Sequence, residues 1–268
     1  MEQPLPAERQ RRIREVLRAR GSIRVVTLAE LLGVSEVTVR RDLEELEGRG
    51  LLERTHGGAI EAQRLRVEAP YRSAIELRPS EKQRIGEAAA SLLRGPETVF
   101  LNGGTTTLQV FRRIADPAVT VVTNHVGMAL ESDGHPCEVH LVGGAYRANS
   151  NSCVGPFATE AIRRVFASRS VIGAEGVSIR SGLTTPAAAE AEVARVMIEQ
   201  TQGPVVVVAD HTKIGTVADF GIAEIERVHV LVTDEGIDAA YREELEGRGI
   251  EVVVAGAPVG VGSGAGHG

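Results

Sequence analysis

The chain has 268 residues, 43% of them apolar, a length that suits one large domain or two ordinary ones. No apolar run approaches the length of a membrane span, and the charged N-terminus MEQPLPAERQRRIRE contains no hydrophobic signal core. Cys137 and Cys153 have neither CxxC nor metal-ligand spacing, so we expect two reduced thiols. These features predict a cytoplasmic protein without a membrane span, a bound metal or a cofactor.

The charged residues are unevenly distributed. The net charge is −6, yet residues 1–60 carry 11 arginines and 10 acidic residues, so the excess acid lies in the remainder. A nearly neutral N-terminal segment should bind non-specific DNA weakly. Of the 30 basic residues only Lys82 and Lys213 are lysines. In so arginine-rich a chain, a lysine can mark a position that needs a compact ammonium group. Chance explains the presence of two lysines equally well.

Residues 1–60 are predicted to form three helices followed by a hairpin. The first helix covers residues 6–20, with Arg9, Arg11, Arg12 and Arg14 on or near its exposed side. Thr27 and Glu30 have the spacing of a capping box that opens a second, short helix. The run from Leu51 to Ile60 then predicts a β-hairpin turning at Gly57-Gly58.

The third helix is predicted from SEVTVRRDLEEL, residues 35–46. Val39, Leu43 and Leu46 share one helical face, and Ser35 precedes it as a capping residue. A glycine turn at Gly33 joins this helix to the one before it, which indicates a helix-turn-helix extended by a wing. The alternative is an ordinary helical hairpin whose adjacent arginines, at positions 40 and 41, form a solvated face.

Residues 61–79 contain charges and two prolines without sustained periodicity, and we interpret them as a linker with one helical turn at most. Residues 80–254 are then predicted to form an α/β domain. Its first helix runs to Leu93 and opens with a Ser80–Gln83 capping box. Apolar strand-length runs follow, alternating with helices near residues 158–165, 186–200 and 238–245. This order predicts a mostly parallel sheet covered on both faces. The Gly-rich residues 255–268 are predicted to be disordered.

Polar residues follow several of these strands, where ligands bind in open α/β sheets. Gly103 to Thr107 offer hydroxyls and a helix start, the ingredients of a phosphate cradle, although a glycine turn with capping threonines explains the run as well. Lys82 and Lys213 have the charge to neutralise a phosphate, and Asp210 can accept bonds from sugar hydroxyls. The alternatives are a solvated helix end for Lys82 and an Asx turn for Asp210. P-loop, dinucleotide-binding and hydrolase motifs are absent.

The sequence resembles DeoR-type bacterial transcriptional regulators over nearly its whole length. VTLAELLGVSEVTVRRDLEELEGRGLLERTHGGA is similar to their N-terminal signature. The motifs LNGGTTT, VVTNH, LVGGAYR, VGPFA, IGAEGV, GLTT and ADHTKIG follow in the family's order. The resemblance implies a winged helix-turn-helix and a sensor domain related in fold to ribose-5-phosphate isomerase.

The resemblance also implies residue roles. Residues expected to contact double-stranded DNA are Ser35, Glu36, Thr38, Arg40, Arg41 and His56. Residues expected to bind the effector are Lys82, Asn102, Gly104, Thr105, Thr106, Asn124, Gly143, Gly144, Asp210 and Lys213. The family commonly has an acidic residue at the position of Asn102. An amide both donates and accepts hydrogen bonds, so one interpretation is an altered sugar selectivity and the alternative is a pocket that no longer senses an effector.

The function predicted from these residues is regulation rather than catalysis. We expect a repressor of sugar-metabolism genes that is relieved by a phosphorylated sugar and acts as a homodimer or homotetramer. The alternative is a sugar-phosphate isomerase fused to a DNA-binding head, for which Asp210 and Glu175 are the acids nearest to strand ends.

Overall fold

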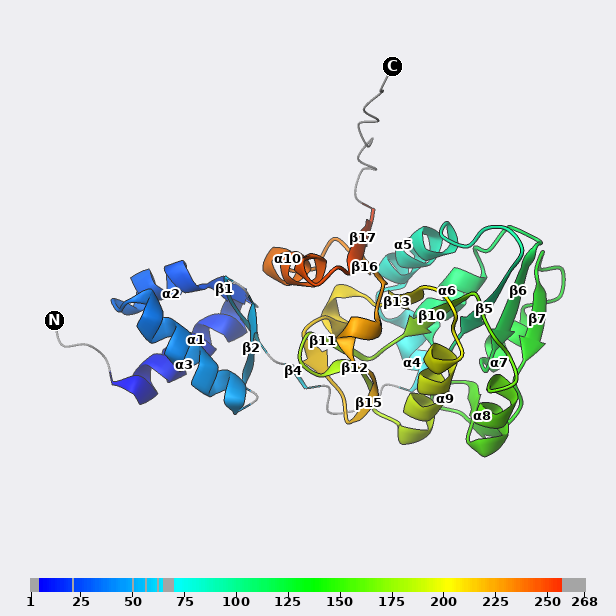
Figure 1. Ribbon diagram of the computed structural model, residues 1–268, viewed down its shortest axis with the longest axis horizontal. Coiled ribbons are helices and arrows are strands. Elements are labelled where there is room, and N and C mark those ends of the chain that lie inside the picture. Colours follow the sequence, from blue (N-terminus) through cyan, green and yellow to red (C-terminus); the bar gives the residue numbers. More distant parts are fainter. Residues whose placement is uncertain are drawn as a thin grey trace, which may run out of the picture.

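The computed structural model describes residues 5–20, 22–49, 51–55, 57–61, 63–64 and 70–256 (Figure 1). Two sequence predictions lie outside the described residues: the DNA-contact candidate His56 and the predicted tail from residue 257 onward. The tail was predicted from residue 255, which is wrong at its start, because Ala255 is the last residue of a strand of the main sheet. Within the described ranges, no helix combines the length and apolar character needed to cross a membrane.

The N-terminal head, residues 5–61, packs three helices against a small sheet (Figure 1). Its elements are α1 (Pro6–Arg20), β1 (Ser22–Arg24), α2 (Val25–Leu32), α3 (Glu36–Gly48), β2 (Leu52–Thr55) and β3 (Gly58–Glu61). The strands are antiparallel in the order β1-β3-β2. Val39, Leu43 and Leu46 are buried in the head's own core, as the periodicity of α3 predicted. The winged helix-turn-helix prediction is thereby confirmed.

The helix caps of the head are only partly as predicted. Ser35 does cap α3, because its hydroxyl accepts a bond from the N–H of Thr38 at 3.3 Å. The Thr27 capping box is wrong, since α2 begins at Val25 and includes Thr27. The N–H of Val25 donates instead to the carbonyl of Gly57 in the wing, at 2.8 Å. A main-chain acceptor thus replaces a capping side chain there.

The wing contains a third strand that the sequence did not predict. β1 pairs with β3 so closely that a Cβ on Gly58 would lie 2.1 Å from the carbonyl oxygen of Ile23. Gly58 therefore belongs to β3 and permits this approach, rather than forming half of the turn.

Arg9 is not on an exposed face of α1, contrary to prediction. Its Nε and Nη2 atoms donate to the two carboxylate oxygens of Asp42 on α3, at 2.7 and 3.1 Å. Both side chains are buried, with exposed fractions of 10% and 5%. This pair ties α1 to α3 through the interior of the head.

The sensor domain is a three-layer α/β structure (Figure 1). Its helices are α4 (Tyr71–Glu76), α5 (Pro79–Ala90), α6 (Thr105–Phe111), α7 (Val126–Leu130), α8 (Pro156–Ile162), α9 (Ala188–Glu199) and α10 (Ala239–Gly247), with short 3-10 turns η1 (His211–Lys213) and η2 (Ile225–Arg227). The main sheet contains β5 (Glu97–Leu101), β6 (Val119–Thr123), β7 (Glu138–Leu141), β10 (Arg169–Gly173), β13 (Val205–Val208), β16 (Val230–Asp234) and β17 (Glu251–Ala255). The remaining strands are β4 (Gln63–Arg64), β8 (Ala145–Arg147), β9 (Ser152–Val154), β11 (Gly176–Ser178), β12 (Gly182–Thr185), β14 (Thr216–Val217) and β15 (Phe220–Ala223).

The seven strands of the main sheet are parallel and lie in the order β17-β16-β13-β10-β5-β6-β7. One hydrophobic core lies on each face of this sheet, which confirms the predicted parallel α/β fold. The chain runs outward from β5 to β7 and then returns to β10 on the other side of β5. The β5/β10 boundary is therefore the topological switch point, where open α/β sheets bind ligands.

The segment predicted as a linker contributes ordered elements. β4 pairs in parallel with β14, and α4 lies at the carboxyl end of the main sheet. The predicted Ser80 capping box is wrong: α5 begins at Pro79, after Arg78 in a left-handed conformation, and the Ser80 hydroxyl donates to the carboxylate of Glu81. Proline suits this first position, because its fixed φ matches the helix and it has no N–H to satisfy.

Candidate functional site

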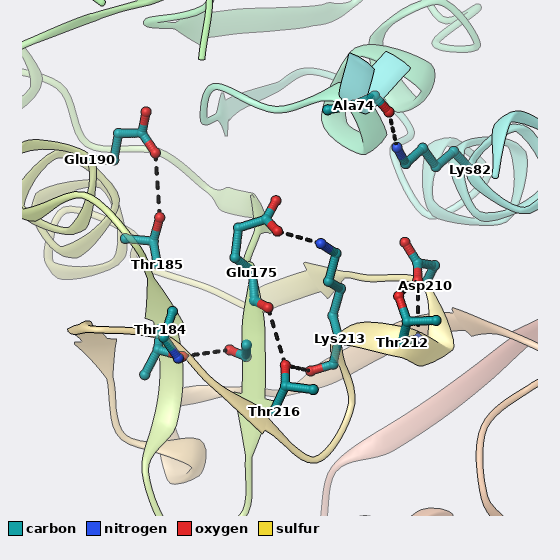
Figure 2. A network of polar contacts seen from close by, with 12 residues as sticks. Ala74, Lys82, Glu175, Thr184, Thr185, Glu190, Asp210, Thr212, Lys213 and Thr216 are labelled. Atoms are coloured by element: carbon teal, nitrogen blue, oxygen red, sulfur yellow. Dashed lines mark hydrogen bonds and ion pairs between the residues drawn. The ribbon is translucent and has the colours of Figure 1, made fainter. Parts of the chain in front are cut away.

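A cavity lies at the switch point, between the carboxyl ends of the central strands and the segment formed by α4 and α5 (Figure 2). Eight of the ten predicted effector-binding residues line it: Lys82, Asn102, Gly104, Thr105, Thr106, Asn124, Asp210 and Lys213. Gly143 and Gly144 do not line it, which corrects their prediction. They follow β7 at the sheet edge, where a Cβ on Gly144 would lie 2.6 Å from the carbonyl oxygen of Val154. Close main-chain packing explains that glycine.

The two lysines of the chain converge on this cavity. Lys82, on α5, is only 6% exposed, and its ammonium donates to the carbonyl of Ala74 in α4 at 2.6 Å. Burial lowers the pKa of Lys82 below its usual value. Lys213, at the end of η1, forms an ion pair with the carboxylate of Glu175 (Figure 2). The solvated-helix-end reading of Lys82 is therefore wrong.

Asn102 and Asn124 are anchored to the main chain that shapes the cavity. The Asn102 amide donates to the carbonyl of Gly173 at 2.9 Å and accepts from the N–H of the same residue at 2.8 Å. Asn124 accepts from the N–H of Gly103 at 2.9 Å and donates to the carbonyl of Cys153 at 2.9 Å. Asn102 thus extends the contact between the two strands one residue beyond the end of β5, to the last residue of β10. Both amides position the loop after β5, which differs from the sugar-contacting role expected for Asn102.

The loop after β5 leads directly into α6. The Thr107 hydroxyl donates to the carbonyls of Asn102 and Gly104, at 2.8 and 3.0 Å, so this threonine stabilises the turn. Thr105 and Thr106 are half-buried and line the cavity. The alternative interpretation, a glycine turn stabilised by threonine, therefore applies to Thr107. Thr105 and Thr106 line the cavity as predicted.

Asp210 follows β13 and is 3% exposed. Its carboxylate accepts bonds from the N–H of Thr212, at 3.0 Å, and from the hydroxyl of that residue, so the predicted Asx-turn alternative is present (Figure 2). The neighbouring His211 is held by Asp234 on β16, with 2.7 Å between Nδ1 and the carboxylate oxygen. These contacts fix the segment that presents Lys213 to the cavity.

Several cavity residues were not among the predicted effector ligands: Tyr71, Arg78, Asn149, Ser150, Ser152, Glu175 and Glu190. The sequence could have indicated Glu175, because this residue follows β10 at the carboxyl end of the sheet, where ligands bind. No sequence pattern indicated Tyr71 and Arg78, since both lie in the segment predicted as a linker. The cavity combines cationic side chains with the carboxylates of Asp210, Glu175 and Glu190, a set suited to a ligand that carries both an anionic group and hydroxyls.

A second candidate site is the exposed face of α3. Ser35, Glu36, Arg40 and Arg41 are exposed and Thr38 is half-buried, as a DNA-reading face requires. Arg40 and Glu36 form an ion pair of 3.2 Å within the helix. Because exposed pairs of this kind contribute little free energy, Arg40 is available to turn toward another anion.

His125 is a buried neutral residue beside the cavity loop. Its Nδ1 accepts a bond from the N–H of Met128, and its Nε2 has no hydrogen-bond partner among the described residues. The Tyr71 ring lies against it, with 5.3 Å between ring centroids. Burial lowers the pKa of His125 from 6.5 to about 4.

This histidine should make the stability of the protein pH-dependent. Between pH 6.5 and about 4 the unfolded chain binds a proton at His125 that the folded chain does not, so stability falls as the pH falls. The free energy of unfolding should therefore fall by at most about 3 kcal/mol on account of His125. The loss begins as the pH drops below 6.5 and is complete once the pH is below about 4. Urea unfolding of the wild type and of His125→Asn, which retains a capping acceptor, should show a smaller loss in the variant. Equal losses would contradict this assignment.

The chain is similar to two families of domains and to several full-length transcriptional regulators. Residues 9–64 match the DeoR-like helix-turn-helix domain, and residues 78–235 match the DeoR C terminal sensor domain. The HTH-type transcriptional regulator GlpR of Haloferax volcanii is 37% identical over 250 residues, covering 93% of this chain and 98% of that protein. The transcriptional repressor AccR of Agrobacterium fabrum is 35% identical, covering 85% of this chain and 90% of the relative. The putative aga operon transcriptional repressor of Escherichia coli O157:H7 is 31% identical, with coverages of 93% and 94%.

Similarity to solved structures is weaker. Ribose 5-phosphate isomerase A from Methanocaldococcus jannaschii has a TM-score of 0.37 and 11% identity, covering 50% of this chain and 53% of that one. At this level the likeness carries no argument about activity. The matches to both family domains and to full-length relatives show that the chain belongs to the DeoR family and is a DNA-binding transcriptional regulator.

Proposed function

We propose that the protein is a repressor of sugar-metabolism genes that is relieved when a phosphorylated sugar binds the switch-point cavity. The observation that carries this proposal is the convergence of Lys82 and Lys213, the two lysines of the chain, on one cavity that also contains Asp210. The relative named as an aga operon repressor is in keeping with such a role.

The lining of the cavity suits the two parts of a phosphorylated sugar. Ammonium groups neutralise phosphate as compact charges with three donors each, and burial strengthens that attraction. Thr105 and Thr106 add hydroxyls at the start of α6. Carboxylates such as Asp210 accept hydrogen bonds from sugar hydroxyls. The cavity thus offers positive charge for the phosphate and hydrogen-bond acceptors for the sugar hydroxyls.

On the DNA side, the N-terminal half of α3 would enter the major groove with Arg40 and Arg41 directed toward base edges or phosphates. A homodimer or homotetramer would place two such helices about 34 Å apart along the operator. Effector binding relieves repression if it favours an arrangement of heads that no longer fits this spacing.

A binding role is favoured over the isomerase alternative by the state of the two candidate acids. The Asp210 carboxylate accepts two bonds from Thr212, and the Glu175 carboxylate is paired with Lys213. Isomerisation needs a base positioned to take a substrate proton. In the structure both carboxylates already have partners, and the charge of Glu175 is neutralised by an ammonium, so neither is placed as a free base.

The proposed effector site is tested by Lys213→Ala. Because removal of the ammonium deletes one of two lysine charges, we expect the affinity for a sugar phosphate to fall at least about tenfold, in line with the loss of one charge-assisted contact. A thermal-shift screen of sugar phosphates against the wild type would first identify a ligand, and calorimetry would then compare the variants.

The matched control is Arg195→Ala, which removes the same charge from α9. Arg195 is exposed and lies outside the cavity lining. This control should bind the sugar phosphate like the wild type. An unchanged affinity in Lys213→Ala would count against the cavity as the effector site.

A further inference from the structure

The effector cavity is connected to the recognition helix by a hairpin formed by β11 and β12. The hairpin begins next to Glu175, whose carboxylate pairs with Lys213 in the cavity (Figure 2). The Thr216 hydroxyl lies 3.2 Å from the carbonyl of Glu175 and 2.9 Å from that of Lys213, bridging the two segments. The base of the hairpin and the lysine-bearing loop are therefore fastened together at the cavity.

The hairpin is stiffened along its length. The N–H of Gly215 donates to the carbonyl of Val177 at 2.8 Å, which continues the attachment to the loop after Lys213. The buried Tyr241 hydroxyl donates to the same carbonyl at 3.1 Å and accepts from the N–H of Ile179 at 2.9 Å. The hairpin is therefore an ordered connection, bonded at Val177 and Ile179, between Glu175 at its base and Arg180 at its tip.

The tip of the hairpin contacts the head. The Arg180 guanidinium donates to the carbonyl of Glu47, in the last turn of α3, at 2.7 Å. A cation at the carboxyl end of a helix satisfies a free carbonyl and is favoured by the helix dipole. Glu44 and Arg54 of the head line the same junction. The contact occupies the carboxyl end of α3 and leaves the exposed Arg40 and Arg41 near its other end uncovered.

The connecting segment is attached to the same loop. β4, which follows the head, pairs with β14, so that Gln63 lies opposite Thr216. The loop that carries Lys213 is thus linked to the head by both the hairpin and the connecting strand.

We propose that the β11–β12 hairpin docks the recognition helix, and that the Glu175–Lys213 ion pair controls this docking. The proposal rests on the proposed function. In the absence of effector, the Glu175 carboxylate is paired with the Lys213 ammonium, and Arg180 holds α3 in an orientation that can bind the operator. An anionic effector competes with Glu175 for Lys213, the freed carboxylate carries the base of the hairpin with it, and Arg180 leaves the Glu47 carbonyl. The head then loses its fixed orientation and the operator affinity falls.

Arg180→Ala tests the docking contact without any ligand. Arg180 is exposed, so the fold should be retained. We expect operator affinity, measured by fluorescence anisotropy with the full-length protein, to fall threefold to tenfold. Amide hydrogen exchange in the last turn of α3 should become faster. Arg195→Ala is the matched control, because Arg195 also donates to a carbonyl, that of Gly221 at 2.7 Å, but within the sensor domain. Equal operator affinities and exchange rates in the two variants would overturn the proposal.

Glu175→Gln tests the control of docking by the ion pair. The variant should also weaken operator binding, and the double variant with Arg180→Ala should bind no more than twofold more weakly than either single one, because both act through one chain of contacts. Additive losses would overturn the coupling. Calorimetry with inorganic phosphate provides a separate measurement: Glu175→Gln should bind it about threefold more tightly than the wild type, since a competitor is gone. Binding equal to the wild type would overturn the competition, whereas phosphate binding unaffected by Lys213→Ala would instead count against the proposed effector site.

Discussion

Arg41→Ala is expected to lower operator affinity by at least ~30-fold. A bidentate contact between an arginine and a base contributes about 1–3 kcal/mol, and a complex with two heads loses it twice. Arg41 is exposed and near the N-terminal end of α3, while the residues that hold this helix in the head, such as Leu43, are buried. The substitution should therefore leave the fold intact. Anisotropy titrations of an operator fragment at fixed salt would measure the effect.

Arg40→Ala should lower operator affinity by a comparable factor. The fold should be retained, because breaking the exposed pair between Arg40 and Glu36 costs little stability. A suitable control is Arg242→Ala on α10, since Arg242 forms the same i,i+4 type of pair with Glu246, at 2.8 Å, outside the head. This control should bind the operator like the wild type. Footprints of normal strength from both α3 variants would refute the assignment of α3 as the recognition helix.

The second large effect is expected for Asp42→Ala. This carboxylate accepts two hydrogen bonds from Arg9 in the interior of the head, and its removal leaves a buried guanidinium without its carboxylate. Breaking one side of such a pair typically costs about 3–5 kcal/mol. The free energy of unfolding of the head, measured by urea titration of the full-length protein, should fall by this amount. Operator binding should weaken with it, because the pair fixes α3 against α1.

Two further variants separate the ion pair from general damage to α3. Glu45→Ala removes a part-buried bond from Gln10, at 2.8 Å, between the same two helices, together with an exposed ion pair to Arg49 that contributes little. It should cost only about 1 kcal/mol. Replacing both Arg9 and Asp42 by leucine should recover much of the stability lost in Asp42→Ala, since no unpaired charge remains. Similar losses of stability in Asp42→Ala and Glu45→Ala would show that leaving the buried Arg9 guanidinium unpaired costs no more than losing an ordinary hydrogen bond.

Much of the fold follows from local patterns. The spacing of Val39, Leu43 and Leu46 predicted the buried face of α3, and the apolar runs of the sensor domain predicted its parallel strands. These predictions succeed because burial repeats with the period of a helix, or continues along a strand that is covered on both faces. The carboxyl ends of those strands indicated the cavity, because the connections in a parallel sheet bring these ends to one edge.

Predictions that depended on a single polar side chain were less reliable. The threonine and serine capping boxes failed because other groups begin those helices: a wing carbonyl accepts from Val25, and Pro79 needs no cap. Arg9 looked exposed because its partner, Asp42, is on another helix. Asn102 lines the cavity, but the sequence did not indicate that its amide pairs with the main chain of Gly173. In each case the partner is distant in sequence, or is a main-chain group that no residue letter identifies.

The sequence by itself determined that the chain carries a helix-turn-helix, a parallel α/β domain and two conspicuous lysines. These properties depend on periodicity and composition, which are local quantities. Only the tertiary structure decided that Lys82 and Lys213 line one cavity, that Glu175 pairs with one of them and that Arg180 contacts the recognition helix. Those relations depend on how β5, β10 and β13 are ordered in the sheet and on how the β11–β12 hairpin extends from it. Strand order is set by packing of the whole domain, and no short stretch of sequence encodes it.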